Sequence, residues 1–256
     1  MKQAKIIGIV SYKGGVGKTT FTTNLAIVLT QEYKKNVLVV DGSIGCPTLG
    51  LHFGYQEPDR TLQDCLNSKF LTIKDIIYEH KSGLHLIAAS HSKKVQSFGS
   101  FKPMIRSLRR YYDFILIDSS PIIGEETYAV MKASDFLFVV TNTDHVSLGS
   151  SMRTIKSALN KGINIKGVIL NKVLNKRFEL DFATIEDATK LPILLSINYD
   201  MDFIKALGEG MPLGLYNPRN SEIKKHKQLA SALCGNLSEK PMNKESINRV
   251  ILNFKS

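Results

Sequence analysis

The segment SYKGGVGKTT, from Ser11 to Thr20, contains the residues whose types and spacing have the clearest chemical meaning. Its glycines allow the backbone to turn until several N–H groups face one phosphate, and the N-terminus of the helix expected to follow adds a favourable dipole. Lys18 is expected to contact the β- and γ-phosphates of a bound nucleotide, and the Thr19 hydroxyl is placed for Mg²⁺. The predicted phosphate-binding residues are Gly14, Gly15, Val16, Gly17, Lys18, Thr19 and Thr20.

The elements that must hold this loop alternate between short apolar runs and helix-like segments. The apolar runs lack polar alternation, and crossover helices between such strands are typical of a parallel sheet. The sequence therefore predicts an α/β fold: a mostly parallel sheet with helices on both faces. Strands are expected at 5–11, 36–41, 83–88, 114–118, 136–141, 165–170 and 193–197. Helices are expected at 18–32, 73–80, 101–112, 125–133, 148–160, 181–190, 200–207 and 220–233.

Composition excludes several classes of protein. Of 256 residues, 43% are hydrophobic and 22% charged, which is ordinary for a soluble globular chain. We see no apolar run of about 18 residues and no secretory segment before the first strand, so we expect a cytoplasmic protein. The three cysteines, Cys46, Cys65 and Cys234, form no Cys-x-x-Cys pair, which argues against a disulfide framework or a zinc site.

The charge balance points to an anionic partner without selecting one. Lysine and arginine number 34 against 23 acidic residues, for a formal net charge of +11. Such an excess favours nucleic acid, an acidic lipid surface or an acidic protein, but it also serves solubility alone.

A lysine directly before the paired glycines, Lys13 here, marks the deviant P-loop family, and the chain resembles the MinD and ParA ATPases. The first glycine of the ordinary P-loop pattern is replaced by Tyr12. The resemblance extends from residue 1 to about 235, and the late segment 210–222 is similar to one that is typical of the archaeal MinD-like branch. It rests on four further segments in the expected order, VLVVDG (37–42), FILIDSSP (114–121), GVILNKV (167–173) and GMPLGLYNPRNSE (210–222).

This resemblance implies roles for individual residues at an ATP site. Lys13 would cross the two-fold interface of a homodimer and supply charge to the partner's nucleotide. Asp41 and Asp118 would hold Mg²⁺ through water, together with Thr19. Asn171 would present its amide to the adenine base. An aspartate at the end of a strand is also a common turn residue, so each carboxylate taken alone has a structural alternative.

Three departures from the family pattern concern hydrolysis. The segment after Asp41 reads Gly42-Ser43, where the family has a second aspartate that orients the attacking water. A hydroxyl can hold a water molecule but cannot accept its proton at neutral pH. Gly124 also falls later after Asp118 than the family pattern has it, and Ser150 lies where an acidic residue is common. We expect these departures to weaken ATP hydrolysis. The alternative is that they are tolerated variations and that turnover is only as slow as it is in the family generally.

Two features suggest contact with a surface. Basic residues gather at Lys102, Arg106, Arg109 and Arg110 and again at Lys172, Lys176 and Arg177, where they could hold the DNA backbone without sequence preference, as in ParA proteins, or simply form solvated faces. After a domain at 1–235 and a polar linker at 236–243, residues 244–256 place four apolar side chains on one face of an expected helix: Ile247, Val250, Ile251 and Phe254.

The C-terminal helix is similar in place and character to the membrane-binding helix of MinD, and a helix docked on its own domain or on a partner is the alternative. The resulting hypothesis is a MinD-like ATPase whose ATP-bound homodimer engages an anionic membrane surface and an activating or cargo protein, as a cytoplasmic protein attached peripherally to the cell membrane. The alternatives are a ParA-like partition ATPase on nonspecific DNA and a nucleotide-gated adaptor with little hydrolysis.

Overall fold

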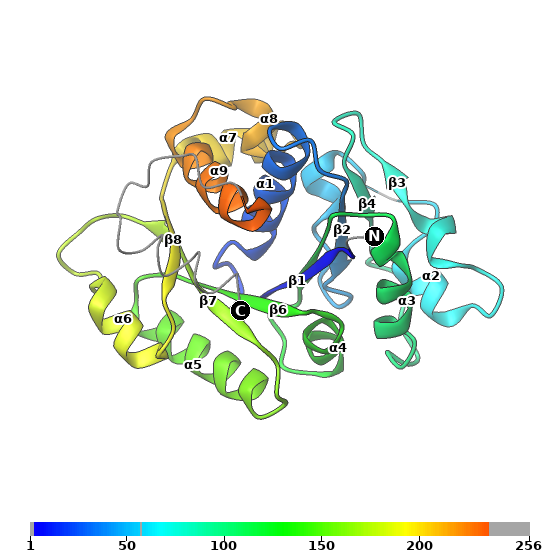
Figure 1. Cartoon of the computed structure of the whole chain (residues 1–256), viewed down its shortest axis with the longest axis horizontal. Helices are drawn as coiled ribbons and strands as arrows, with labels where there is room; N and C mark the ends of the chain where they lie inside the picture. Colours follow the sequence, from blue (N-terminus) through cyan, green and yellow to red (C-terminus); the bar gives the residue numbers. More distant parts are fainter. Residues whose placement is uncertain (1–2, 57, 236–256) are drawn as a thin grey trace.

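A central eight-stranded sheet lies between two layers of helices, which confirms the predicted α/β fold class (Figure 1). The computed structural model describes residues 3–56 and 58–235. The predicted linker 236–243 and the predicted helix 244–256 lie outside the described residues. The strands are β1 (Lys5–Val10), β2 (Val37–Gly42), β3 (Tyr78–Glu79), β4 (His85–Ile87), β5 (Phe114–Ser119), β6 (Phe136–Thr141), β7 (Ile165–Val173) and β8 (Ile193–Asn198).

The strand order is β3-β4-β2-β5-β1-β6-β7-β8, and every neighbouring pair is parallel except β3 with β4. β5, β2 and β4 therefore lie on one side of β1, and β6, β7 and β8 lie on the other side. In open parallel sheets such a change of direction leaves a crevice at the carboxyl ends of the strands. Asp41 of β2 lies opposite Asp118 of β5, which lies opposite Ile9 of β1, so the predicted metal carboxylates reach the edge where the glycine-rich loop begins.

The helices divide between the two faces of the sheet (Figure 1). One face carries α1, α7, α8 and α9, and the other carries α3, α4, α5 and α6. Their bounds are α1 (Lys18–Gln31), α2 (Leu62–Asn67), α3 (Phe101–Ser107), α4 (Glu125–Ala133), α5 (His145–Leu159), α6 (Phe182–Thr189), α7 (Met201–Gly208), α8 (Leu213–Tyr216) and α9 (Ser221–Cys234), with 3-10 turns η1 (Gly50–Phe53), η2 (Ile73–Ile76) and η3 (Leu108–Arg110).

Alternate residues of the central strands enter different core layers. Along β1, Ile7 and Ile9 belong to the layer that contains Phe21 of α1, whereas Ile6 and Val10 belong to the layer that contains Val130 of α4. A parallel strand covered on both faces buries both sets of side chains, which explains why these strands read as continuous apolar runs. None of the helices described is long and apolar enough to cross a lipid bilayer.

All seven predicted strands are present, but the predicted helix 73–80 is wrong. A 3-10 turn occupies Ile73–Ile76, Ile77 is extended, and Tyr78 and Glu79 pair antiparallel with β4. Its β-branched isoleucines lose side-chain freedom in a helix, and pairing with β4 satisfies the backbone instead. Gly83, whose φ of 80° favours glycine, lies in the turn that joins the two strands.

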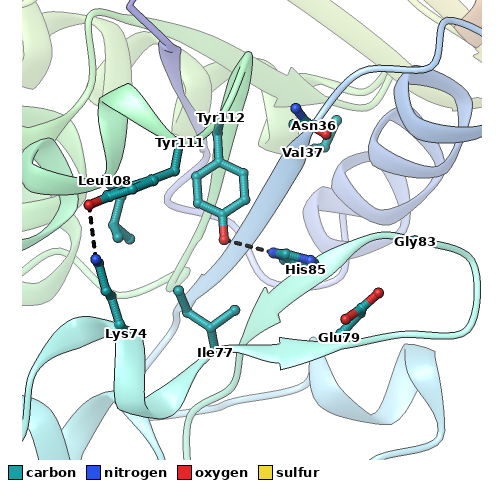
Figure 2. A pocket seen from close by; sticks show the side chains of 10 residues that line it. All are labelled: Asn36, Val37, Lys74, Ile77, Glu79, Gly83, His85, Leu108, Tyr111 and Tyr112. Carbon is teal, nitrogen blue, oxygen red and sulfur yellow. Dashed lines mark hydrogen bonds between the residues drawn. The ribbon is translucent and has the colours of Figure 1, made fainter.

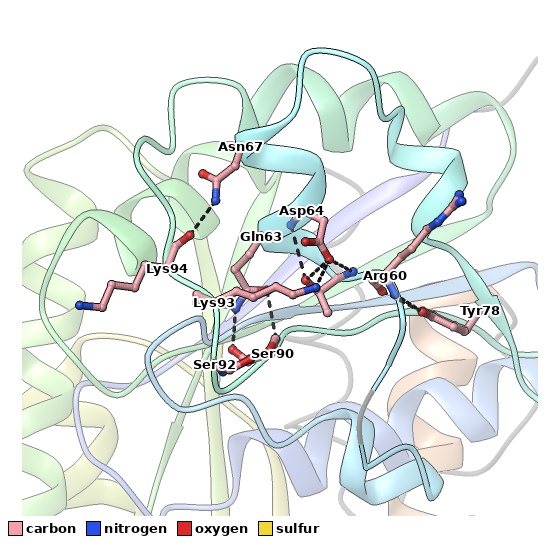
Figure 3. Close-up of polar contacts among 10 residues, drawn as sticks. Arg60, Gln63, Asp64, Asn67, Tyr78, Ser90, Ser92, Lys93 and Lys94 are labelled. Atoms are coloured by element: carbon pink, nitrogen blue, oxygen red, sulfur yellow. Dashed lines mark hydrogen bonds and ion pairs between the residues drawn. The ribbon is translucent and has the colours of Figure 1, made fainter.

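Two further differences from the predictions have local causes. α5 begins at His145, earlier than expected, because the Asp144 side chain accepts a hydrogen bond from the Ser147 N–H and caps the helix. α2 was not predicted. Thr61 and Asp64 form a capping box at its start, and Lys93 makes an ion pair with Asp64 at 2.6 Å, which fixes this part of the chain beside the sheet (Figure 3).

Candidate nucleotide-binding site

The glycine-rich loop joins the carboxyl end of β1 to the N-terminus of α1, as predicted. Gly15 has a φ of 74° and Gly17, the N-cap of α1, a φ of 94°, both in the left-handed region that favours glycine. A Cβ on Gly17 would also lie 2.0 Å from the Asn171 amide nitrogen. The loop geometry therefore depends on these two glycines, and it leaves the first N–H groups of α1 available to an anion.

Lys18 is held inside this loop. Only 6% of the residue is exposed, and its ammonium donates a hydrogen bond to the carbonyl oxygen of Lys13 at 3.3 Å. Burial lowers the pKa of Lys18, while the nearby Asp118 carboxylate opposes that shift. A buried ammonium that has one carbonyl acceptor among the described residues gains from an anionic ligand, which is what a nucleotide phosphate provides.

Asp41 and Asp118 form a pair of fully buried carboxylates. Burial, with a contribution from the charge of Asp118, raises the pKa of Asp41 to about 8, and burial raises the pKa of Asp118 to about 6. Asp41 accepts hydrogen bonds from the N–H groups of Ser43 and Leu49, each at 3.0 Å.

The donor set fits a magnesium ion. Asp118 Oδ2 accepts a hydrogen bond from the Thr19 hydroxyl at 2.5 Å, whereas its buried Oδ1 has no hydrogen-bond partner among the described residues. Two carboxylates and a hydroxyl beside the phosphate loop are oxygen ligands of the kind that Mg²⁺ prefers, and the charge of a cation would relieve the buried pair. The three residues predicted as metal ligands thus meet at one place.

The Lys13 side chain points away from the phosphate loop and toward the start of α5. This side chain is 31% exposed, and its ammonium lies 3.4 Å from Asp144 Oδ2 and 2.5 Å from the Ser147 hydroxyl. Although burial opposes the shift, the hydrogen bonds from Ser147 and the charge of Lys13 lower the pKa of Asp144. Asp144, which was not predicted, therefore both caps α5 and holds Lys13 within its own chain.

Asn171 packs directly on the phosphate loop. Its side-chain amide donates a hydrogen bond to the Val16 carbonyl at 2.8 Å. Two residues that were not predicted as site residues act beside it: Asn142 donates to the Asn171 carbonyl at 2.8 Å, and Lys172 donates to the Gly15 carbonyl at 2.7 Å. Each lies at or just beyond the carboxyl end of a strand, and this position is the sequence signal that could have identified them.

The loop between β2 and η1 contains Ser43, the residue predicted to hold the attacking water. Ser43 is buried, and its hydroxyl donates a hydrogen bond to the Cys46 carbonyl at 2.9 Å. Further along the loop, the Gly45 N–H donates to Glu126 Oε2 at 3.0 Å. Glu126, in the first turn of α4, was not predicted as a site residue.

A cavity of about 530 Å³ lies away from this site (Figure 2). It is at the amino ends of β2 and β4, the opposite edge of the sheet from the phosphate loop, and Lys74–Tyr111 and His85–Tyr112 hydrogen bonds lie in its wall. The nearby basic group is partly engaged, because Arg109 makes an ion pair with Asp135 and Arg110 lies 4.9 Å from the centre of the Tyr111 ring. This cavity is therefore separate from the nucleotide site.

A glycine-rich loop between β1 and α1, a buried lysine within it and paired carboxylates on the neighbouring strands define a P-loop nucleotide-binding protein. The family described as AAA domain matches residues 4–166. An uncharacterised ATP-binding protein of Methanocaldococcus jannaschii is 32% identical and covers 93% of this chain and 91% of its own length. The septum site-determining protein MinD of Thermotoga maritima is 29% identical, over 86% of this chain and 84% of its own.

Solved structures agree. The septum site-determining protein MinD of Pyrococcus horikoshii, complexed with Mg-ADP, has 27% sequence identity and a TM-score of 0.83, over 93% of this chain and 100% of that chain. The chain belongs to the MinD/ParA family of P-loop proteins and is an ATP-binding protein of that family, as the sequence predicted.

Proposed function

We propose that the protein is a slow ATPase whose ATP-bound form is a homodimer that positions another cellular structure. The position of Lys13 carries this proposal. Lys18 occupies the interior of the phosphate loop, so a second lysine on the loop is not needed for the chain's own phosphates. Lys13 is instead partly exposed and lies outside the loop, beside Asp144. A cation in that position can supply charge to the nucleotide of a second copy, as an arginine finger does.

The surface around Lys13 favours a second copy as its partner. Ile122 and Ile123, in the loop after β5, are 55% and 53% exposed, and Val146, in the first turn of α5, is 72% exposed. Large apolar side chains that are exposed on the monomer gain free energy when a dimer buries them.

The proposed roles in hydrolysis are those that the resemblance implies for the residues of this site. Lys18 would neutralise the phosphates, and Thr19, Asp41 and Asp118 would hold Mg²⁺, which supplies further charge neutralisation when bound. Ser43 can orient a water molecule but cannot take its proton, so turnover is expected to be slow. Asn171 would present its amide to the adenine base.

The surface that the dimer engages is proposed to be an anionic membrane, through residues 244–256, with an activating or cargo protein as a further partner. Support comes from the apolar stripe Ile247, Val250, Ile251 and Phe254 and from the net charge of +11. MinD of Aquifex aeolicus is known in a complex with MinC, an example of a protein partner for a member of this family. Nonspecific DNA is the second candidate surface, because a positive net charge favours binding to DNA as well as to an anionic membrane.

The decisive experiment compares wild type with Lys13→Ala in light scattering, with and without ATP. The variant should keep measurable affinity for ATP and lose ATP-dependent dimerisation. Lys156→Ala, which removes an exposed lysine of α5, should behave as wild type. A Lys13→Ala protein that still dimerises with ATP would disprove the proposal. Flotation with anionic liposomes and pelleting with DNA, each with ATP and with ADP, then distinguish the membrane from DNA as the surface. A wild-type protein that dimerises with ATP but does not hydrolyse it would support the nucleotide-gated adaptor.

A further inference from the structure

Two loops of the nucleotide site meet at the start of α4. The Gly45 N–H, at the tip of the loop between β2 and η1, donates a hydrogen bond to Glu126 Oε2 at 3.0 Å. A Cβ on Gly45 would lie 3.7 Å from Ile122 Cδ1, in the loop between β5 and α4. The first loop is therefore joined to the first turn of α4 by a charge-assisted hydrogen bond, and its Gly45 lies close to the Ile122 side chain of the second loop.

The other side-chain hydrogen bonds of the first loop lie near its two ends, and Ile44 packs against the core. The Asp41 carboxylate accepts the N–H groups of Ser43 and Leu49, which fixes the beginning and the end of the loop. The Ser43 hydroxyl bonds to the Cys46 carbonyl within the same loop. Residues 44–46 form the tip of the loop. In the part of the chain that the structure describes, the hydrogen bond that joins this tip to another element is the one accepted by Glu126.

The residue after Glu126 holds the second loop. The Thr127 hydroxyl is directed at the Ile122 carbonyl, at 2.7 Å, and at the Ser120 carbonyl, at 3.2 Å. One turn of helix thus holds both loops through adjacent residues, Glu126 on one side and Thr127 on the other. A carboxylate is also favoured in the first turn of a helix by the helix dipole, so Glu126 does not destabilise α4.

We propose that Glu126 is a positioning residue for ATP hydrolysis, which couples the loop that contains Ser43 to the loop that follows Asp118. This inference rests on the proposed ATPase function and names a residue that acts in it. Because Ser43 stands where the family has a second carboxylate, orientation of the attacking water depends on how firmly its loop is held. Glu126 holds that loop by accepting a backbone N–H, and fixing a loop in its productive geometry raises the rate of the chemical step.

The test compares Glu126→Ala with Glu126→Gln. Glutamine keeps an oxygen that can accept the Gly45 N–H, so its turnover should stay within about threefold of wild type. Alanine removes the acceptor and should lower kcat roughly tenfold or more, the effect expected for loss of a charge-assisted hydrogen bond, while the affinity for ATP changes by less than about threefold. Glu125→Ala, in the same helical turn, is the matched control and should leave turnover unchanged.

Amide hydrogen exchange at Gly45 provides a readout independent of activity. In nucleotide-free protein, exchange at Gly45 should be faster in Glu126→Ala by about tenfold and close to wild type in Glu126→Gln, with equal melting temperatures. Normal turnover and normal Gly45 exchange in Glu126→Ala would overturn this inference alone. A glutamine variant as slow as alanine would also overturn it, because the carboxylate would then act as a base. Absence of turnover in the wild type would overturn the proposed function itself, with the Gly45 contact still tested by exchange.

Discussion

Replacing Asp118 by asparagine should stabilise the protein when nucleotide and Mg²⁺ are absent. Asp41 and Asp118 are register partners on β2 and β5, and both are buried. Burial raises the pKa of Asp118 to about 6, and burial together with the charge of Asp118 raises the pKa of Asp41 to about 8. Without a cation, the native state therefore bears the cost of two buried negative charges once both groups ionise.

The sign and size of the effect follow from these pKa values. A carboxyl group whose pKa is raised by folding contributes stability that is complete below the unfolded pKa, near 4, and is lost as the pH rises through the folded pKa. The loss therefore extends from about pH 4 to about pH 6 for Asp118 and continues toward pH 8 for Asp41. A shift of about two units corresponds to about 3 kcal/mol. The asparagine side chain in Asp118→Asn carries no charge and keeps an oxygen that can accept the Thr19 hydroxyl, so the variant should gain about 1–3 kcal/mol at pH 8 and about half as much at pH 5.

The assay is thermal unfolding in EDTA from pH 5 to pH 8.5. For a protein of this size, the gain at pH 8 corresponds to a rise in Tm of about 2–12 °C. Asp187→Asn, at a side chain that is 81% exposed, is the control and should not change the pH dependence. Mg²⁺ with ADP should stabilise wild type more than Asp118→Asn. A variant that melts below wild type at pH 8, or that gains equally at pH 5 and pH 8, would refute this account of the carboxylate pair.

Four other changes test the remaining assignments. Lys18→Ala should abolish ATP binding in calorimetry, and undiminished affinity would refute the phosphate site. Asp144→Asn keeps the cap of α5 but removes the charge that holds Lys13, so less ATP should be needed for dimerisation in light scattering; an unchanged midpoint would contradict this. Ser43→Asp should raise turnover about tenfold or more, and an unchanged rate would show that hydrolysis is limited elsewhere. Phe254→Glu should remove ATP-dependent sedimentation with anionic liposomes; equal sedimentation of wild type with ATP and ADP would argue against the membrane hypothesis.

The elements nearest the phosphate loop could be predicted because their causes are local. β1, the loop and α1 are contiguous, and the glycines required at Gly15 and Gly17 follow from backbone conformations that other residues rarely adopt. The apolar runs likewise predicted seven strands, because a strand buried on both faces must be apolar throughout. The helix predicted at 73–80 is wrong because the apolar spacing of that segment suits a helix, whereas pairing of β3 with β4 decides its conformation.

The sequence by itself thus determined the phosphate loop and the strands of the sheet, since each is encoded in residues close together along the chain. It also determined the family, through short segments that occur in a fixed order. Only the tertiary structure decided how side chains far apart in the sequence meet at the site. Asn171 reaches a loop residue 155 positions away, and Glu126 reaches Gly45 across 81 positions. Neither contact has a sequence pattern, because it depends on which strands become neighbours and on how far each loop extends beyond the sheet. The pairing of Asp41 with Asp118 has the same origin, since their carboxylates repel each other and are brought together by the register of β2 and β5.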